Sequence, residues 1–434
     1  MNRFSAFMSS LRPLPKAVVI TLMTLAFSHV AMYDLTSVSF FSPMEKAADF
    51  RFSDFYTLVA ANNSDASYEK DIVIVPVDGC NRSRIAETIS DIDYCAPAAV
   101  GLDIFFTPLP DSESDPLVEA LADCDNLVLP ALVVADSTEL RISHGSYYDS
   151  ILTPSGGFAA VNLVESEDQL DNVREFQKGF ATPDGAVNTL AAALAAIGRP
   201  DAYTALDART NKREEIAYSS REFEILTPDE ILDNPDKIEG RIVLVGKLQD
   251  RGDKHITPLN NYTPGLMIHA YILATIINGD YIRQLSMWEE VMLGALLCFL
   301  VVWINVHLMA SVMGPLLVRS LQVGLLCFLI VTGTQAYIRL HVDLNFSYSI
   351  LTVSLGVAAC EVYGAIFDRN GLIDFIYSKY RKIKSKRHEK DKNEKGGEGT
   401  SVADGDDSTS GASCGAEDLQ GEGGCDSAVG QIDT

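Results

Sequence analysis

Cysteine is scarce in this chain, with eight cysteines scattered over 434 residues. There is no Cys-x-x-Cys pair and no Cys/His grouping with the spacing of a zinc site. These absences exclude a disulfide-dense scaffold, and the cysteines predict no metal site. In an oxidising compartment, Cys80 and Cys95 could close a loop of about fifteen residues, worth ~3 kcal/mol in the chain-entropy model. Buried free thiols are the alternative for these two residues and for Cys124.

The common signatures of hydrolases and nucleotide-binding enzymes are also missing. There is no Gly-x-Ser-x-Gly elbow and no His-Glu-x-x-His pair, and the segment GKLQDRGD, which starts at Gly246, matches neither a Walker loop nor the dinucleotide fingerprint. Asp78 and Asp103 could form a hydrolytic pair, but two acids near strand ends are expected by chance in so acidic a region. We therefore predict that the chain is not an enzyme and uses no cofactor.

Positive charge is in short supply, because 34 Lys and Arg residues face 59 Asp and Glu residues, a formal net charge of −25. Residues 34–285 hold 41 acids and 19 bases, and residues 393–434 hold ten acids against Lys395. Nucleic acid is therefore not an expected partner, because these segments cannot neutralise phosphates. The exception is a basic block at 379–392, which follows a hydrophobic run and predicts contact with anionic lipid headgroups.

Four apolar runs are long enough to be candidate membrane spans, which need roughly 20 helical residues. They cover residues 17–33, 287–308, 316–337 and 346–367. The first is short and carries His29, so a cleaved signal sequence is its alternative. No Ala-x-Ala-like site follows it, which favours an uncleaved anchor. We predict a helical membrane unit of four transmembrane helices embedded in the lipid bilayer.

The orientation follows from the basic block beside the fourth run, which predicts a cytoplasmic location for that end. An even number of crossings places residues 1–16 in the cytoplasm as well, and residues 34–285 outside, where they can form their own core. We predict a multi-pass protein of the bacterial cytoplasmic membrane. Residues 368–392 read as a basic juxtamembrane helix, and residues 393–434 as a disordered acidic tail.

Strands alternate with helices in the predicted external region. IVIVPVDG, AAVGLDIFF and RIVLVG are apolar on both faces, which is typical of strands buried in a parallel sheet. The segments NRSRIAETISDI, DPLVEALADC and GAVNTLAAALAAIG, which lie between them, predict helices. This alternation predicts an α/β domain with a mainly parallel sheet, although it does not give the strand order.

The order of these motifs also carries a family resemblance. IVIVPVDG is followed by VGLDIFF, NLVLP, FAAVNLVE leading to VREF, and RIVLVG, and then by Asp253, Thr257-Pro258 and PGLMIHA. With one apolar run before this domain and three after it, the chain resembles the CHASE2 family of extracytoplasmic sensor domains over about residues 17–368. It departs from many relatives in its short GCNRSRI segment and in lacking a cyclase, kinase or phosphatase domain after the last run.

The resemblance implies a sensory and signal-transduction protein of the membrane. Such a protein would sense an extracytoplasmic stimulus and relay it through its transmembrane helices to a separate cytoplasmic or membrane partner. We expect no catalytic output domain on this chain, and a homo-oligomer is compatible with the sequence. The alternatives are a membrane-anchored extracytoplasmic hydrolase and an envelope scaffold protein.

Candidate binding residues gather where predicted strands end, which is where parallel α/β sheets bind ligands. The candidates are Asp78, Asp103, Gly246, Asp253, His255, Thr257 and His269. His269 falls in the first turn of a predicted helix, where the helix dipole disfavours a charged imidazole. We predict that these residues bind a small molecule or an ion. The alternative is that the acids cap helices or hold loops and that the histidine is a hydrogen-bonded core residue.

Charge inside an apolar run is costly and therefore informative, and two charged residues of the third and fourth runs stand out. Arg319 is near the start of the third run and Glu361 near the end of the fourth, which places both at a similar depth near the cytoplasmic side. We predict that they are neighbours. The alternative is that Arg319 reaches the lipid headgroups while Glu361 faces water at the interface.

Overall fold

The computed structural model describes thirteen segments of the chain. They are residues 7–8, 11–30, 51–63, 67–106, 115–136, 139–143, 155–164, 172–183, 185–218, 221–260, 262–308, 313–367 and 379–380. The chain divides into a unit of residues 1–373 and a second unit of residues 374–434. The predicted juxtamembrane helix and acidic tail lie outside the described residues, apart from residues 379–380, and the contacts described below all belong to the first unit.

A seven-stranded sheet forms the centre of the α/β domain, in the order β10-β1-β11-β2-β3-β4, with β5 also paired to β3. The strands are β1 (Ser67–Pro76), β2 (Ala99–Asp103), β3 (Leu127–Asp136), β4 (Glu139–Ser143), β5 (Phe158–Ala160), β10 (Arg221–Ile225) and β11 (Ile242–Gly246). Every pairing in it is parallel except that of β3 with β4. The predicted α/β domain with a mainly parallel sheet is confirmed.

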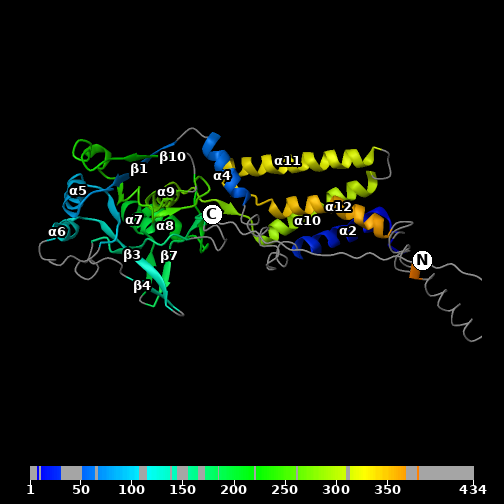
Figure 1. Ribbon diagram of the computed structural model, residues 1–434, viewed down its shortest axis with the longest axis horizontal. Helices are drawn as coiled ribbons and strands as arrows, with labels where there is room; N and C mark the ends of the chain where they lie inside the picture. Colours follow the sequence, from blue (N-terminus) through cyan, green and yellow to red (C-terminus); the bar gives the residue numbers. More distant parts are fainter. Residues whose placement is uncertain are drawn as a thin grey trace, which may run out of the picture. The chain divides into compact units, whose positions relative to one another are not determined.

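Helices cover both faces of this sheet (Figure 1). They are α5 (Arg82–Tyr94), α6 (Pro116–Asp123), α7 (Leu190–Gly198), α8 (Pro200–Asp207) and α9 (Gly265–Asn278). Successive side chains of a strand point to opposite faces. Ile72 and Ile74 of β1 therefore pack with α7 and α9, whereas Val73 and Val75 pack with α5 and α6. This double burial explains why the central strands are apolar on both faces.

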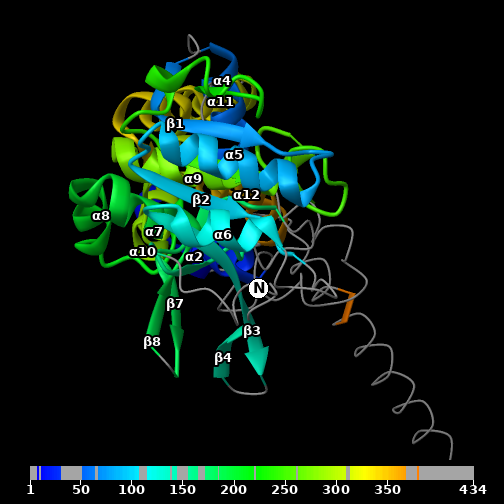
Figure 2. The same cartoon turned by 90° about the vertical axis from the view of Figure 1, so that its left-hand side faces the viewer.

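Four two-stranded pairs surround the main sheet. They are β6 (Glu175–Phe176) with β9 (Glu214–Glu215), β7 (Gly179–Thr182) with β8 (Gly185–Asn188), β12 (Lys254–His255) with β13 (Thr263–Pro264), and β14 (Arg283–Gln284) with β15 (Val342–Asp343). The β7–β8 hairpin lies beside the β3–β4 pair (Figure 2). A short 3₁₀ helix, η5, covers Pro235–Lys237.

Three of the described helices are long and apolar enough to cross a membrane. They are α10 (Met287–Leu308), α11 (Gly314–Leu340) and α12 (Ser347–Phe367). The predicted span at 287–308 coincides with α10, and the other two overlap α11 and α12. The predicted first span begins within α2 (Pro13–His29), a 17-residue helix that packs against α10 and α12. A further helix, α4 (Phe52–Asn63), contacts α11.

Candidate functional site

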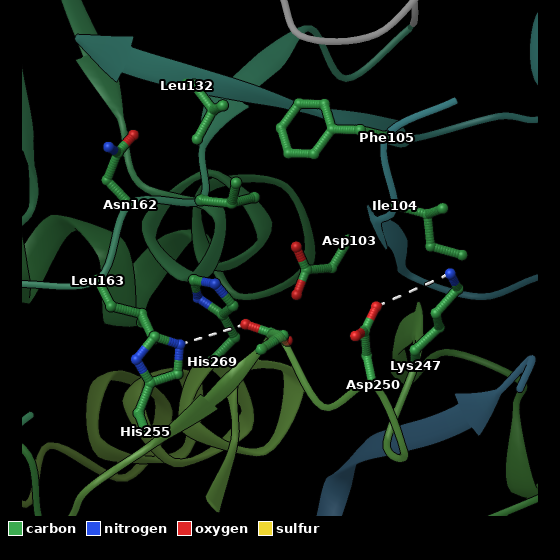
Figure 3. A pocket seen from close by; sticks show the side chains of 12 residues that line it. Asp103, Ile104, Phe105, Leu132, Asn162, Leu163, Lys247, Asp250, His255 and His269 are labelled. Carbon is green, nitrogen blue, oxygen red and sulfur yellow. Dashed lines mark hydrogen bonds and ion pairs between the residues drawn. The ribbon is translucent and has the colours of Figure 1, made fainter. Parts of the chain in front are cut away.

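A cavity of about 540 Å³ opens beyond the carboxyl ends of β2 and β11 (Figure 3). Its lining combines acids, histidines and apolar side chains from five parts of the domain. The lining residues are Asp103, Ile104, Phe105, Leu132, Val161, Asn162, Leu163, Lys247, Asp250, Asp253, His255 and His269. The cavity therefore contains four of the seven residues that the sequence predicts as a binding site.

The register of the sheet puts Asp103 at the edge of this cavity. Asp103 is the last residue of β2 and pairs with Gly246, the last residue of β11. A Cβ atom at position 246 would lie 2.9 Å from Cδ1 of Leu266, on α9, and 3.4 Å from Cβ of Asp103. Gly246 therefore contributes space for the close approach of α9 and supplies no side-chain group to the cavity.

A second glycine makes room for the Asp253 carboxylate. The β12–β13 pairing brings Asp253 beside Gly265, the first residue of α9, and a Cβ atom at position 265 would lie 2.5 Å from Oδ1 of Asp253. The carboxylate thus lies near the amino end of a helix, where the helix dipole stabilises negative charge. His255 Nε2 and Asp253 Oδ1 are 3.2 Å apart.

His269 presents an unsatisfied hydrogen-bond acceptor in this site. Its side chain is only 3% exposed, and burial lowers its pKa to about 4, so the imidazole is neutral at neutral pH. The ring bonds to the backbone of Val161, while Nδ1 has no partner among the described residues. A buried polar atom without a partner is costly, so Nδ1 offers a ligand a favourable hydrogen bond.

Burial also shifts the titration of Asp103. Removal from water, reinforced by the nearby negative charge of Asp253, raises the pKa of Asp103 to about 7. The neutral and ionised forms of this carboxyl are therefore both populated near neutral pH. No hydrogen bond from the described residues reaches the Asp103 carboxyl group. A donor on a ligand would meet a carboxylate that has no competing partner among those residues.

Two of the predicted residues hold loops and do not line the cavity. Asp78 accepts hydrogen bonds from the backbone N–H groups of Leu248, at 3.0 Å, and Gln249, at 2.8 Å. These bonds fix the loop that follows β11. Thr257 is buried and hydrogen-bonds to Thr263 at 2.9 Å. For Asp78 the structure matches the loop-holding alternative, and Thr257 holds a loop as well.

Sequence reasoning missed several lining residues. Lys247 and Asp250 follow β11 directly, with Nζ and Oδ2 3.9 Å apart, so the strand-end rule that selected Gly246 would also have found them. Asn162 follows β5, and its side chain bonds the backbone N–H and C=O of Val133 at 2.7 and 2.9 Å. Apolar lining residues such as Phe105 carry no sequence signal that separates them from core residues.

The candidate disulfide between Cys80 and Cys95 is wrong for this structure, in which Cys80, Cys95 and Cys124 are free thiols. Cys80 precedes α5, whereas Cys95 follows the last residue of that helix. A 13-residue helix rises about 20 Å, and a disulfide needs Cα atoms within about 7 Å. The helix between them keeps these two thiols apart.

Arg319 and Glu361 lie side by side on α11 and α12. Nη2 of Arg319 is 2.6 Å from Oε1 of Glu361, and Nη1 donates to Oε1 of Gln322 at 3.2 Å. Gln322 in turn donates to the backbone carbonyl of Val353 at 3.4 Å. The two charges thus belong to a polar group that joins the second and third membrane-length helices.

A second polar cluster joins the α/β domain to the membrane-length helices. Glu215 of β9 is 7% exposed and accepts hydrogen bonds from Tyr337 Oη and Gln284 Nε2, both at 3.3 Å. Tyr337 Oη also lies 2.7 Å from Oγ1 of Thr57, on α4. Gln284 belongs to β14, which pairs with β15 between α11 and α12. We call Thr57, Glu215, Gln284 and Tyr337 the junction cluster.

The parallel sheet, the cavity at its carboxyl edge and the three membrane-length helices define a membrane-associated α/β protein. The family model described as the CHASE2 domain matches residues 17–306, which is more than half of the chain. The chain belongs to the CHASE2 family, whose members are extracytoplasmic sensor domains. No curated protein and no solved structure matches this chain.

Proposed function

We propose that this chain is a membrane-bound sensor that binds a small molecule or an ion in the cavity outside the cell. It passes the signal through its membrane helices to a separate cytoplasmic or membrane partner. One observation carries this proposal: α9 begins beside the cavity at Gly265, ends at Asn278 and is followed shortly by α10 at Met287. A ligand bound near His269 would therefore act directly on the helix that leads into the membrane.

The far end of α9 is attached to the α/β domain by a hydrogen bond and by ion pairs. Nδ2 of Asn278 donates to Glu69 Oε2 at 2.9 Å, and Arg221 forms ion pairs with both Glu69 and Asp280. Beyond this point, β14 pairs with β15, so a shift would also reach the connection between α11 and α12. Binding drives such a shift only if the ligand has different affinities for the two arrangements.

The membrane arrangement that we propose has four crossings. Helix α2 supplies the first, because Ala17 and Ile20 pack in one cluster with Cys298 of α10 and Tyr363 of α12. Both ends of the chain then lie in the cytoplasm of a bacterium, and residues 34–285 lie outside. The basic block at 379–392 supports this orientation, because positive charge marks cytoplasmic flanks.

The proposal includes no catalytic step on this chain. A hydrolytic pair of Asp78 and Asp103 has little support, because Asp78 accepts two backbone hydrogen bonds and does not line the cavity with Asp103. The output therefore depends on a partner that recognises the cytoplasmic side of the helices.

The relay can be tested without knowing the ligand, by filling the cavity with a side chain. Leu132→Trp places an indole in the cavity, whereas Leu140→Trp, on the exposed strand β4, is the matched control. We expect L132W, but not L140W, to change hydrogen–deuterium exchange in the first turn of α10 and in β15 of the full chain in lipid nanodiscs. Changes confined to the cavity would refute the relay.

A further inference from the structure

Among the described residues, the inner part of the cavity offers hydrogen-bond acceptors and no free positive charge. Asp103 has no hydrogen bond from the described residues, and Nδ1 of His269 has no partner there. Asp253 lines the same cavity, and its negative charge acts on the pKa values of both Asp103 and His269. Lys247, the one Lys or Arg among the described lining residues, lies beside Asp250. The lining therefore selects against anions and favours donors and cations.

The remaining wall is apolar and limits the kind of cation. Ile104, Phe105, Leu132, Val161 and Leu163 form this wall. A bare metal ion would leave it unused, and the described residues contain no group of three or more His, Cys, Asp or Glu placed to hold one. A cavity of about 540 Å³ lies within the range that takes small organic ligands. These features together indicate an organic cation with an apolar part.

We propose that the cavity binds a small primary ammonium compound. Its three N–H groups donate hydrogen bonds to Asp103, Asp253 and Nδ1 of His269. Its short aliphatic part packs against the apolar wall. An ammonium group has three donors and no acceptor. This matches three acceptor groups, of which Asp103 and Nδ1 of His269 have no hydrogen-bond partner among the described residues, while Asp253 lies beside His255. This inference rests on the proposed sensing function and names the chemical class of its stimulus.

The arrangement makes binding depend on pH. The ammonium group needs Asp103 in its ionised form, and the pKa of Asp103 is raised to about 7 by burial and by Asp253. The other groups that face this carboxyl are the neutral His269, His255 beside Asp253, and the Lys247–Asp250 pair. An alkylammonium group stays charged throughout this range. Affinity should fall roughly tenfold per pH unit below about pH 6 to 7.

Three probes of equal length test the proposal on the full chain in lipid nanodiscs: n-butylammonium, n-butanol and n-butyrate. Thermal unfolding and calorimetric titration measure binding. We expect saturable stabilisation by n-butylammonium alone. Asp103→Asn should weaken this binding roughly tenfold or more, because it removes a charge-assisted hydrogen bond. The matched control Asp201→Asn, at an exposed position on α8, should bind as the unmodified chain does.

The variants also separate this proposal from the proposed function. Loss of n-butylammonium binding and of its pH dependence in D103N, with both retained in D201N, supports the ammonium site. Equal binding by D103N, preference for n-butanol or n-butyrate, or no binding of any probe overturns it. The sensing function has its own test in the exchange response to L132W. It survives the failure of the ammonium site if that response is seen.

Discussion

Glu215 is the carboxyl group of the junction cluster, and its buried position shifts its pKa into the neutral range. Burial, reinforced by the negative charge of Asp343, raises the pKa of Glu215 to about 8. At neutral pH the native carboxyl is therefore largely protonated and can remain buried at low cost. In the unfolded chain the same carboxyl would ionise near pH 4.

This shift predicts that stability falls as pH rises. Between about pH 4 and pH 8 the native state holds a proton that the unfolded state releases, so the contribution of Glu215 is complete at low pH and is lost as pH rises to 8. The slope should approach ~1 kcal/mol per pH unit. In Glu215→Gln, thermal unfolding of the full chain from pH 5 to pH 8.5 should show a flatter dependence. An unchanged slope would contradict the assignment.

The Arg319–Glu361 pair leads to a charge-reversal prediction. Reversing Arg319 to Glu, or Glu361 to Arg, sets two like charges at the position of a 2.6 Å contact, and each single variant should lose stability by ~1–3 kcal/mol. The double reversal should restore most of this loss. Unfolding in nanodiscs measures both effects. If the double variant is no better than the sum of the single variants, the two charges do not depend on each other.

At the scale of elements, α9 has glycines at both ends with different roles. Gly265 leaves room for the Asp253 carboxylate, whereas Gly279 ends the helix in the left-handed region with φ of 67°. A left-handed C-terminal position favours glycine because other residues clash there. The two ends therefore predict separable effects of the same substitution.

Gly265→Ala should displace the Asp253 carboxylate and abolish n-butylammonium binding. Gly279→Ala should lower stability by ~1 kcal/mol through backbone strain and leave binding intact. Calorimetric titration and thermal unfolding of the two variants in parallel measure these effects. Normal binding by G265A would show that the position of the Asp253 carboxylate does not matter.

Helix α11 meets the α/β domain through the Tyr337 hydroxyl group, which contacts Thr57 and Glu215. Tyr337→Phe removes both hydrogen bonds and should cost ~1–3 kcal/mol, because it leaves buried polar groups without a partner. It should also reduce the exchange response of β15 to L132W. The control is Tyr262→Phe, at an exposed position. An unchanged exchange response of β15 to L132W in Y337F would show that the Tyr337 hydroxyl group does not couple the cavity to β15.

At the scale of the whole molecule, the proposed topology predicts opposite accessibilities for two exposed tyrosines. Tyr94, the last residue of α5, is 83% exposed, and Tyr380, which lies beyond the last membrane-length helix in the sequence, is 62% exposed. A membrane-impermeant maleimide should label Tyr94→Cys in intact spheroplasts, and should label Tyr380→Cys only after the membrane is permeabilised. The unmodified chain measures the background from its own cysteines. Labelling of Tyr380→Cys in intact spheroplasts, with Tyr94→Cys labelled only after permeabilisation, would contradict the proposed topology and the sensing function that depends on it.

A feature of the fold or the site could be predicted from the sequence when it depends on neighbouring residues, and could not when it depends on residues far apart in the chain. The strands IVIVP and RIVLVG could be predicted because burial on two faces requires apolar residues at successive positions. The strand order could not, because the pairing of β11 between β1 and β2 joins residues far apart in the chain. The same limit applies to Asp78 and Asp103. Asp103 ends β2 and Asp78 lies two residues beyond β1, but only Asp103 lines the cavity.

The pairing of β14 with β15 has a consequence for building chimeric receptors. It joins the segment that precedes α10 to the connection between α11 and α12. The α/β domain is therefore attached to the helical bundle at two places that are distant in sequence. Grafting residues 34–285 onto a single foreign helix would keep the chain connection at α10 and lose the β14–β15 pairing. A functional chimera should therefore include α10, α11 and α12 of this chain, up to Phe367.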